Sequence, residues 1–151
     1  MLNRRRLVAT VLAATLLLGV AVTPAAALSQ VSLTGCAVGG GVQHVTPDFV
    51  YLKAGWGAKT KGQLLSNLKS LTWNVTVDGT AVDVTPFVAD PYKDNDNWWV
   101  YFYLPAGQLA LDETMTASVE YVLSKPVYDG YDHYPAGSFG TFECTIVADL
   151  T

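Results

Sequence analysis

Apolar and polar residues alternate along much of the chain, and this is the pattern of β-strands that bury one face. The clearest case is the segment Trp73–Val84, where an Asp-Gly dipeptide separates two alternating runs and favours a type I′ hairpin turn. With that dipeptide at the centre of the turn, the apolar side chains of both runs fall on one face. The cross-strand pairs expected are Val77 with Thr80, Val75 with Val82 and Trp73 with Val84.

A second strand is predicted over Trp98–Leu104, and the turn-forming segment Pro105–Gly107 is expected to end it. Its two faces differ in character, because alternate positions of a strand point in opposite directions. The face expected to be buried carries Trp98, Val100, Phe102 and Leu104. The other face carries a stripe of three aromatic residues, Trp99, Tyr101 and Tyr103.

A third strand is predicted over Thr114–Leu123, and Pro126 closes it. Its inward positions are Met115, Ala117, Val119, Tyr121 and Leu123. Shorter strands are expected at Val31–Leu33, Phe49–Lys53 and Phe139–Val147.

One short helix is expected between the strands, because Thr60 and Gln63 have the spacing of a capping box. Leucines follow at helical spacing, namely Leu64, Leu65, Leu68 and Leu71. The strands recur at intervals of about ten residues, without regular alternation of strand and helix. The sequence therefore predicts an all-β fold, an antiparallel immunoglobulin-like β-sandwich with one short helix.

The N-terminal residues have the organisation of an export signal. Three arginines, Arg4–Arg6, precede the uncharged apolar run Leu7–Val22, and small alanines that end at Ala27 suit a signal peptidase. We therefore predict a signal peptide over residues 1–27 and a β-sandwich domain over residues 28–151, secreted or held at the cell surface.

Two features of this segment bear on export and on partners. Asn3–Val8 also fits the loose pattern of a twin-arginine signal, so the sequence leaves open the Sec and the twin-arginine routes. Cleavage removes three of nine basic residues and none of 13 acidic ones, so the mature net charge becomes −7. Such a surface repels nucleic acid, and no later apolar run of about 20 residues predicts a membrane span.

The two cysteines lie near the two ends of the mature domain, so a disulfide would tie its first strand to its last. Phe142, Cys144 and Ile146 share the inward face of their strand, which points that thiol into the core. Cys36 has the opposite parity to the strand before it, so a bulge near Gly35 is expected.

A lipid anchor is the competing interpretation of Cys36. The segment Leu33–Cys36 matches the pattern of a bacterial lipobox, in which the cysteine is acylated and becomes the mature N-terminus. Acylation would leave Cys144 as a free thiol outside the cell, and polar residues interrupt the apolar segment before the motif. We therefore favour the disulfide between Cys36 and Cys144, with lipid anchoring through Cys36 as the alternative.

Two glycine- and aromatic-rich segments, Ala54–Gly62 and Asp132–Gly137, resemble stretches of uncharacterised exported bacterial proteins with an immunoglobulin-like core. The resemblance implies the same β-sandwich fold and no particular activity. The disulfide between the two sheets of antibody domains is not reproduced, because pairing the two cysteines of this chain joins its ends.

Enzyme motifs are absent from the sequence, which contains no Gly-x-Ser-x-Gly elbow, no His-Glu-x-x-His and no phosphate-binding loop. The adjacent carboxylates Asp112 and Glu113 point in opposite directions on a strand, and a turn after Leu111 explains them better.

The loop Asp90–Asn97 carries oxygen ligands suited to calcium but lacks the glycine and the distal glutamate of an EF-hand loop. We therefore expect no cofactor, with calcium in this loop as the alternative.

Aromatic residues are the best candidates for ligand binding. The stripe of Trp99, Tyr101 and Tyr103 suits the stacking of sugar rings, and strand propensity alone also explains it. A second group on an expected loop comprises Tyr128, Tyr131 and Tyr134.

The sequence favours a non-catalytic exported module with a binding or structural role, whose protein or glycan ligand it leaves undefined. A carbohydrate-binding domain is the alternative, and a hydrolase of unrecognised type comes third.

Overall fold

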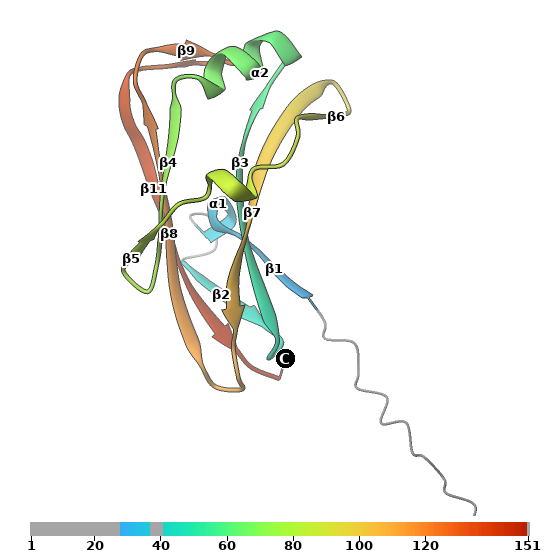
Figure 1. Cartoon of the computed structure of the whole chain (residues 1–151), viewed down its shortest axis with the longest axis vertical. Helices are drawn as coiled ribbons and strands as arrows, with labels where there is room; N and C mark the ends of the chain where they lie inside the picture. The colour runs from blue at the N-terminus through green and yellow to red at the C-terminus, as the bar shows by residue number, and fades with distance from the viewer. Residues whose placement is uncertain (1–27, 37–40, 151) are drawn as a thin grey trace, which may run out of the picture.

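A computed structural model describes residues 28–36 and 41–150, in which two β-sheets pack face to face (Figure 1). The first sheet contains, in spatial order, β1 (Leu28–Ser32), β3 (Phe49–Ala58), β7 (Asn97–Gln108) and β6 (Tyr92–Asp94). The second contains β2 (Val42–Val45), β11 (Gly137–Ala148), β8 (Thr114–Leu123), β4 (Leu71–Val77) and β5 (Thr80–Val82). The predicted all-β sandwich is confirmed, and the predicted export signal, residues 1–27, lies outside the described residues.

Smaller elements connect the strands of the two sheets. The predicted helix is present as α2 (Lys61–Leu68), and its capping box is complete, because Thr60 Oγ1 accepts from the Gln63 amide at 3.2 Å and Gln63 Oε1 accepts from the Thr60 amide. This helix lies across one end of the two sheets, near β9 (Figure 1). The remaining elements are α1 (Leu33–Cys36), the 3₁₀ turn η1 (Thr85–Phe87), and the hairpin of β9 (Val127–Tyr128) and β10 (His133–Tyr134).

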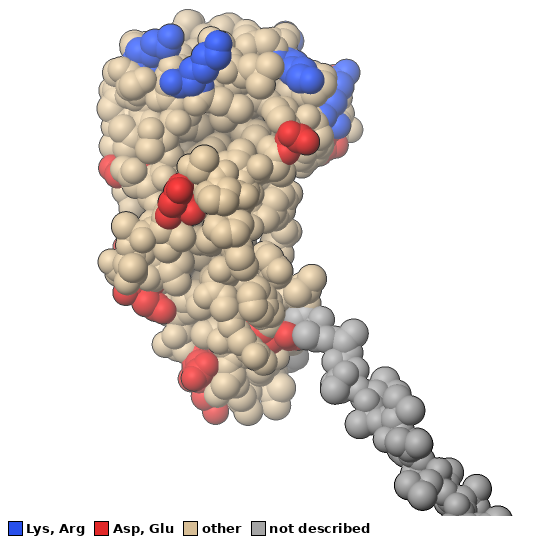
Figure 2. All heavy atoms as spheres, viewed as in Figure 1, with Lys and Arg blue, Asp and Glu red and all other residues tan. Residues whose placement is uncertain are grey.

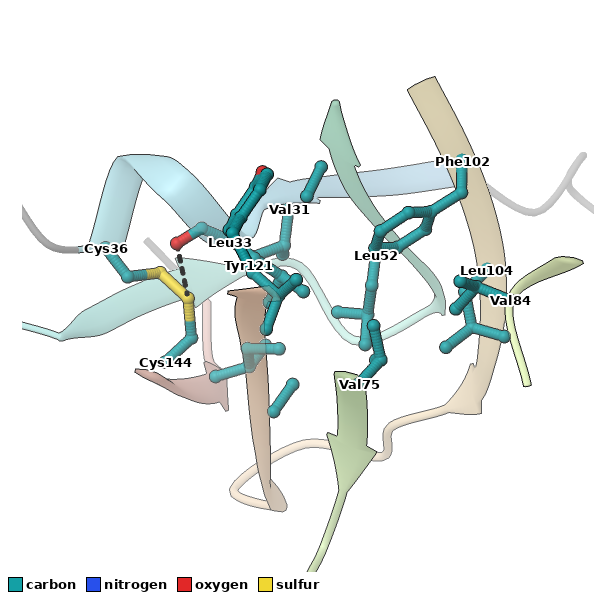
Figure 3. Packing of buried hydrophobic residues seen from close by; sticks show 14 of the residues in the cluster. Val31, Leu33, Cys36, Leu52, Val75, Val84, Phe102, Leu104, Tyr121 and Cys144 are labelled. Atoms are coloured by element: carbon teal, nitrogen blue, oxygen red, sulfur yellow. Dashed lines mark hydrogen bonds between the residues drawn. A yellow bond between two sulfur atoms is a disulfide. The ribbon is translucent and has the colours of Figure 1, made fainter. Parts of the chain in front are cut away.

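The core lies between the two sheets and is filled by the alternate positions that the sequence pattern assigned to it (Figure 3). Phe102 of β7 and Val119 of β8 are fully buried, and all the predicted inward positions of β8 are buried. The predicted two-faced character of β7 and β8 is therefore confirmed.

The hairpin of β4 and β5 has the predicted turn. Asp78 and Gly79 have φ values of 47° and 74°, the positive values that a type I′ turn requires. The pairs of Val77 with Thr80 and Val75 with Val82 are confirmed. The pair of Trp73 with Val84 is wrong, because β5 ends at Val82 and the chain turns into η1, while Trp73 pairs with Tyr121 of β8.

Strand β7 continues beyond the predicted end at Pro105–Gly107 and reaches Gln108. Val50 pairs with Gly107 and Tyr51 with Pro105, so Ala106 is the extra residue of a β-bulge. The bulge accommodates the proline and lets the ladder with β3 go on, which is why the proline does not end the strand.

The two cysteines form the predicted disulfide, with their Cα atoms 5.4 Å apart and a separation of 108 positions in the sequence (Figure 3). The expected bulge near Gly35 is wrong. A single helical turn, α1, changes the direction of the chain instead and buries Cys36 beside Leu33. Because the sulfur of Cys36 is bonded to Cys144, it cannot carry a lipid thioether, and the lipid-anchor alternative does not fit this structure.

The edge strands β1 and β2 are short, and they differ from the antiparallel prediction because both pair in parallel with their neighbours. Strand β1 pairs with residues 49–53 of β3, and β2 pairs with residues 145–148 of β11. Among the described residues, no strand continues either sheet beside residues 54–58 of β3 or residues 137–144 of β11. The sandwich therefore has an opening on its side, between two unpaired strand edges.

Candidate functional site

The predicted aromatic stripe lies on the outer face of the first sheet. The rings of Trp99 and Tyr101 are stacked with centroids 5.8 Å apart and planes at 15°. Tyr103 continues the row at 6.2 Å from Tyr101, and Tyr92 of β6 stacks beside Tyr101 at 6.2 Å. We call these four residues the aromatic platform. Tyr92 was not predicted from the sequence, because β6 is a strand of three residues whose pairing depends on a tight turn.

Two glycines of β3 determine how the platform rings lie. Gly55 pairs with Tyr101 and Gly57 pairs with Trp99. A Cβ atom on Gly57 would meet three atoms of the Trp99 benzene ring at 2.7 to 2.9 Å, and one on Gly55 would collide with the Tyr101 ring. The two rings therefore rest on bare backbone and stay half-buried. Lys53 adds a cation at 5.0 Å from the Tyr101 centroid.

The three tyrosines of the second candidate group do not form one patch. Tyr131 donates from its hydroxyl to Asn97 Oδ1 at 2.7 Å, and Tyr134 donates to Asp129 Oδ2 at 3.1 Å. Tyr128 points elsewhere and stacks on His133 with centroids 4.5 Å apart. Only Tyr131 and Tyr134 of the three therefore contribute to the cavity described next.

A cavity of about 290 Å³ lies at the opening between the two unpaired strand edges. Seven aromatic side chains take part in its lining, namely Trp56, Trp99, Tyr121, Tyr131, Tyr134, Phe139 and Phe142. We call this cavity the aromatic pocket. Its other lining residues are small or uncharged except for Asp129. Trp99 belongs to both the aromatic platform and the aromatic pocket, so the two sites adjoin.

Three pairs of rings in the aromatic pocket are steeply inclined to one another, and three further pairs are tilted by 41 to 48°. Trp56 meets Tyr134 at 5.0 Å and 66°, and Phe139 at 5.5 Å and 73°. Tyr121 meets Phe142 at 5.7 Å and 82°. Such edge-to-face contacts hold the rings at fixed angles, and they turn ring faces in several directions around the cavity.

Sequence reasoning missed this pocket because it assigned Trp56, Tyr121 and Phe139 to no site. Tyr121 and Trp56 occupy inward strand positions, where alternation alone indicates core. The sequence signal for the pocket is the number of aromatic residues at inward positions of neighbouring strands. It can be recognised only when it is known which strands are neighbours.

The polar groups around the pocket are largely satisfied by the protein itself. Asp129 Oδ1 accepts from the amides of Tyr131 at 2.7 Å and Asp132 at 2.8 Å, and its other oxygen accepts from Tyr134. The hydroxyl of Tyr121 donates to the Gly55 carbonyl at 3.1 Å. The indole N–H of Trp56 is the exception, because it is buried without a partner among the described residues.

Charge is unevenly distributed over the molecule. On the face that Figure 2 shows, lysine side chains lie at the end that carries α2, and acidic residues lie from just below them to the opposite end. Within the pocket, burial and the charge of Asp129 raise the pKa of Tyr134 to about 12. The Tyr134 phenol therefore stays neutral at physiological pH and continues to donate to the carboxylate of Asp129.

Alkaline pH is expected to destabilise the fold through Tyr121. Burial raises the pKa of this hydroxyl above its ordinary value of 10.0, so the unfolded chain loses the proton at a lower pH than the folded protein does. The free energy of unfolding then falls as the pH rises above about 10. Urea unfolding at about pH 9 and about pH 11 should show a smaller fall for Tyr121→Phe than for the wild type. Tyr51→Phe is the control for loss of a hydroxyl, and equal falls for Tyr121→Phe and wild type would contradict the assignment.

The remaining chemical candidates have structural explanations. Asp112 has a φ of 66°, and Glu113 Oε2 accepts from the Ala110 amide at 2.8 Å, so the adjacent carboxylates stabilise the turn after Leu111. The loop suggested for calcium forms β6 and a tight turn at Asn95. Among the described residues, no group of three or more histidine, cysteine, aspartate and glutamate side chains is placed to hold a metal ion.

Comparison with known proteins gives no family for this chain, because no family model, curated protein or solved structure matches it. Across residues 28–36 and 41–150, no helix has the length and apolar character needed to cross a membrane. Any function must therefore be argued from the site itself.

Proposed function

We propose that this chain is an exported, non-catalytic binding module that holds a polysaccharide on its aromatic platform, at the cell surface or outside the cell. The observation that carries the proposal is the alignment of Trp99, Tyr101 and Tyr103 in one row on the outer face of the first sheet. Export is supported by the sequence of residues 1–27 and by the disulfide, which forms and persists in oxidising compartments.

The chemistry of the platform suits a neutral sugar chain. The apolar faces of sugar rings pack against aromatic rings, and the hydroxyl groups at their edges stay in water or bind polar neighbours. A row of rings repeats along a strand, as sugar units repeat along a polymer. The predicted mature charge of −7 disfavours polyanions as ligands.

Preorganisation distinguishes this platform from ordinary exposed aromatic residues. The ring of Trp99 lies against Gly57 and the ring of Tyr101 lies against Gly55, where no side chain holds them away from the sheet. Rings that are already fixed lose little conformational freedom on binding, which increases the affinity available from each contact. Strand propensity alone does not explain why a glycine lies opposite each of these two rings. The glycines therefore favour the interpretation of the stripe as a binding surface.

Replacing Trp99 by alanine is expected to weaken polysaccharide binding about tenfold or more, because truncation of a central aromatic contact typically costs more than about 1.4 kcal/mol. Affinity electrophoresis in gels that contain a series of neutral polysaccharides measures the effect. Tyr128→Ala is the matched control, because it removes an exposed ring away from the platform and should migrate as the wild type does. Unchanged mobility of the wild type in every gel would refute the proposal.

A further inference from the structure

We propose that the aromatic pocket is a second binding site, which adjoins the platform at Trp99, and that it takes a small ligand with a quaternary ammonium group. The inference rests on the lining of the pocket and not on the proposed function of the platform. At about 290 Å³ the pocket is near the lower limit of about 300 Å³ for sites that hold small molecules, so it suits a compact ligand.

The ring arrangement favours a cation. A positive charge is attracted to the face of an aromatic ring, and the attraction grows when water is excluded. Seven aromatic residues line the pocket, and the steep angles that Trp56 makes with Tyr134 and with Phe139 turn ring faces in different directions. A compact cation inside such a group of rings contacts more than one of them at once.

The distribution of charge and hydrogen bonds favours a methylated cation in particular. Asp129 supplies the negative charge of the lining, and no lysine or arginine of the described residues takes part in it. Both oxygens of Asp129 already accept hydrogen bonds from Tyr131, Asp132 and Tyr134. A primary ammonium would bring N–H donors that need acceptors, whereas a quaternary ammonium has none to satisfy.

Trp56 contributes apolar ring surface to the lining. Its indole N–H is buried and unpartnered among the described residues, and Trp56 is 6% exposed. The N–H is therefore closed to a ligand in the pocket, and only the ring of Trp56 serves the proposed site. Choline, a compact quaternary ammonium, is the ligand that tests the proposal.

Substitution of Lys59 tests whether the ligand of the pocket is positively or negatively charged. Its ammonium lies 5.8 Å from the centroid of the Tyr131 ring, although Lys59 does not line the pocket. Removing this positive charge from the neighbourhood should strengthen the binding of a cation and weaken the binding of an anion. Lys59→Met keeps most of the aliphatic side chain and changes the charge.

The test compares choline with its neutral isostere 3,3-dimethylbutan-1-ol, using the full mature protein and isothermal titration calorimetry. We expect choline to bind at least about tenfold more tightly, because the cation–π attraction is present only for the charged compound. Ethanolamine, the primary amine, is expected to bind more weakly than choline. Equal affinities for choline and its isostere, or no binding of choline, would overturn the proposal.

Variants then locate the site. Tyr131 is 56% exposed, so Tyr131→Ala is expected to fold normally and to lose about fivefold or more in choline affinity, while Tyr128→Ala keeps the wild-type affinity. Lys59→Met should bind choline more tightly than the wild type. A weaker Lys59→Met complex would contradict a cation site beside Tyr131.

Two further arms separate this inference from the proposed function and identify the source of the ligand. Tyr131→Ala should retain the polysaccharide binding of the wild type. Tyr101→Ala is the matching platform variant, because Tyr101 does not line the pocket, and it should retain choline binding. Sedimentation with phosphatidylcholine vesicles distinguishes a lipid headgroup from free choline as the source of the cation. Loss of choline binding in Tyr101→Ala would place the cation on the platform and overturn the assignment to the pocket.

Discussion

Replacement of both cysteines by alanine is expected to lower the free energy of unfolding by about 2 to 5 kcal/mol. The disulfide between Cys36 and Cys144 closes a loop of 108 residues, and without it the unfolded chain gains the conformational freedom that this closure removes. The double variant is the informative one, since a single substitution leaves a reactive thiol in the core. Urea unfolding followed by tryptophan fluorescence measures the change.

The same disulfide also supports the aromatic pocket. It fastens α1 to β11, and Thr34 of α1 takes part in the lining of the pocket. Reduction of the wild type with dithiothreitol should reproduce the stability of the double variant, and the double variant should not respond to the reductant. Identical unfolding curves for oxidised and reduced wild type would show that the bond makes no contribution in solution.

The parts of the fold that could be predicted from the sequence are those set by local patterns. The inward face of β8 follows from strict alternation, and the turn of the β4–β5 hairpin follows from the preference of Asp78-Gly79 for positive φ. The capping box of α2 is equally local, because Thr60 and Gln63 are three residues apart.

The parts that could not be predicted depend on contacts between distant segments. The sequence predicts a strand over Phe49–Lys53, and Gly55 and Gly57 beyond it are unfavourable in a strand by themselves. The strand continues to Ala58 because rings of β7, far away in the sequence, cover both glycines. The sequence contains both the glycines of β3 and the aromatic residues of β7, but no local pattern indicates that these residues pair.

The candidate sites divide in the same way. The platform stripe is a local pattern on one strand, so Trp99, Tyr101 and Tyr103 could be named from the sequence. The aromatic pocket exists because β1 and β2 pair with only part of β3 and β11, and parallel pairing of such short strands has no local signature. Trp99, Tyr131 and Tyr134 were named from the sequence as binding candidates, but the sequence did not group them with Trp56, Tyr121 and Phe139, which it assigned to no site.

Phe102→Ala is expected to lower the free energy of unfolding by about 3 to 5 kcal/mol, the usual cost of deleting a buried aromatic side chain. Phe102 is 0% exposed, and its ring packs edge to face on Trp73 of the opposite sheet with centroids 5.7 Å apart. Urea unfolding provides the measurement, with Phe49→Ala as a matched control, because Phe49 is a half-buried phenylalanine of the same sheet.

Because Phe102 lines neither the platform nor the pocket, its loss should reduce stability without changing ligand affinity in the folded protein. Phe49→Ala should lower the free energy of unfolding by less than about half as much as Phe102→Ala does, because folding buries less apolar surface at position 49. A loss below about 1 kcal/mol for Phe102→Ala would mean that β7 and β4 do not face each other across the core. Normal choline and polysaccharide affinities in the folded variant would show that both sites depend on surfaces away from the centre of the sandwich.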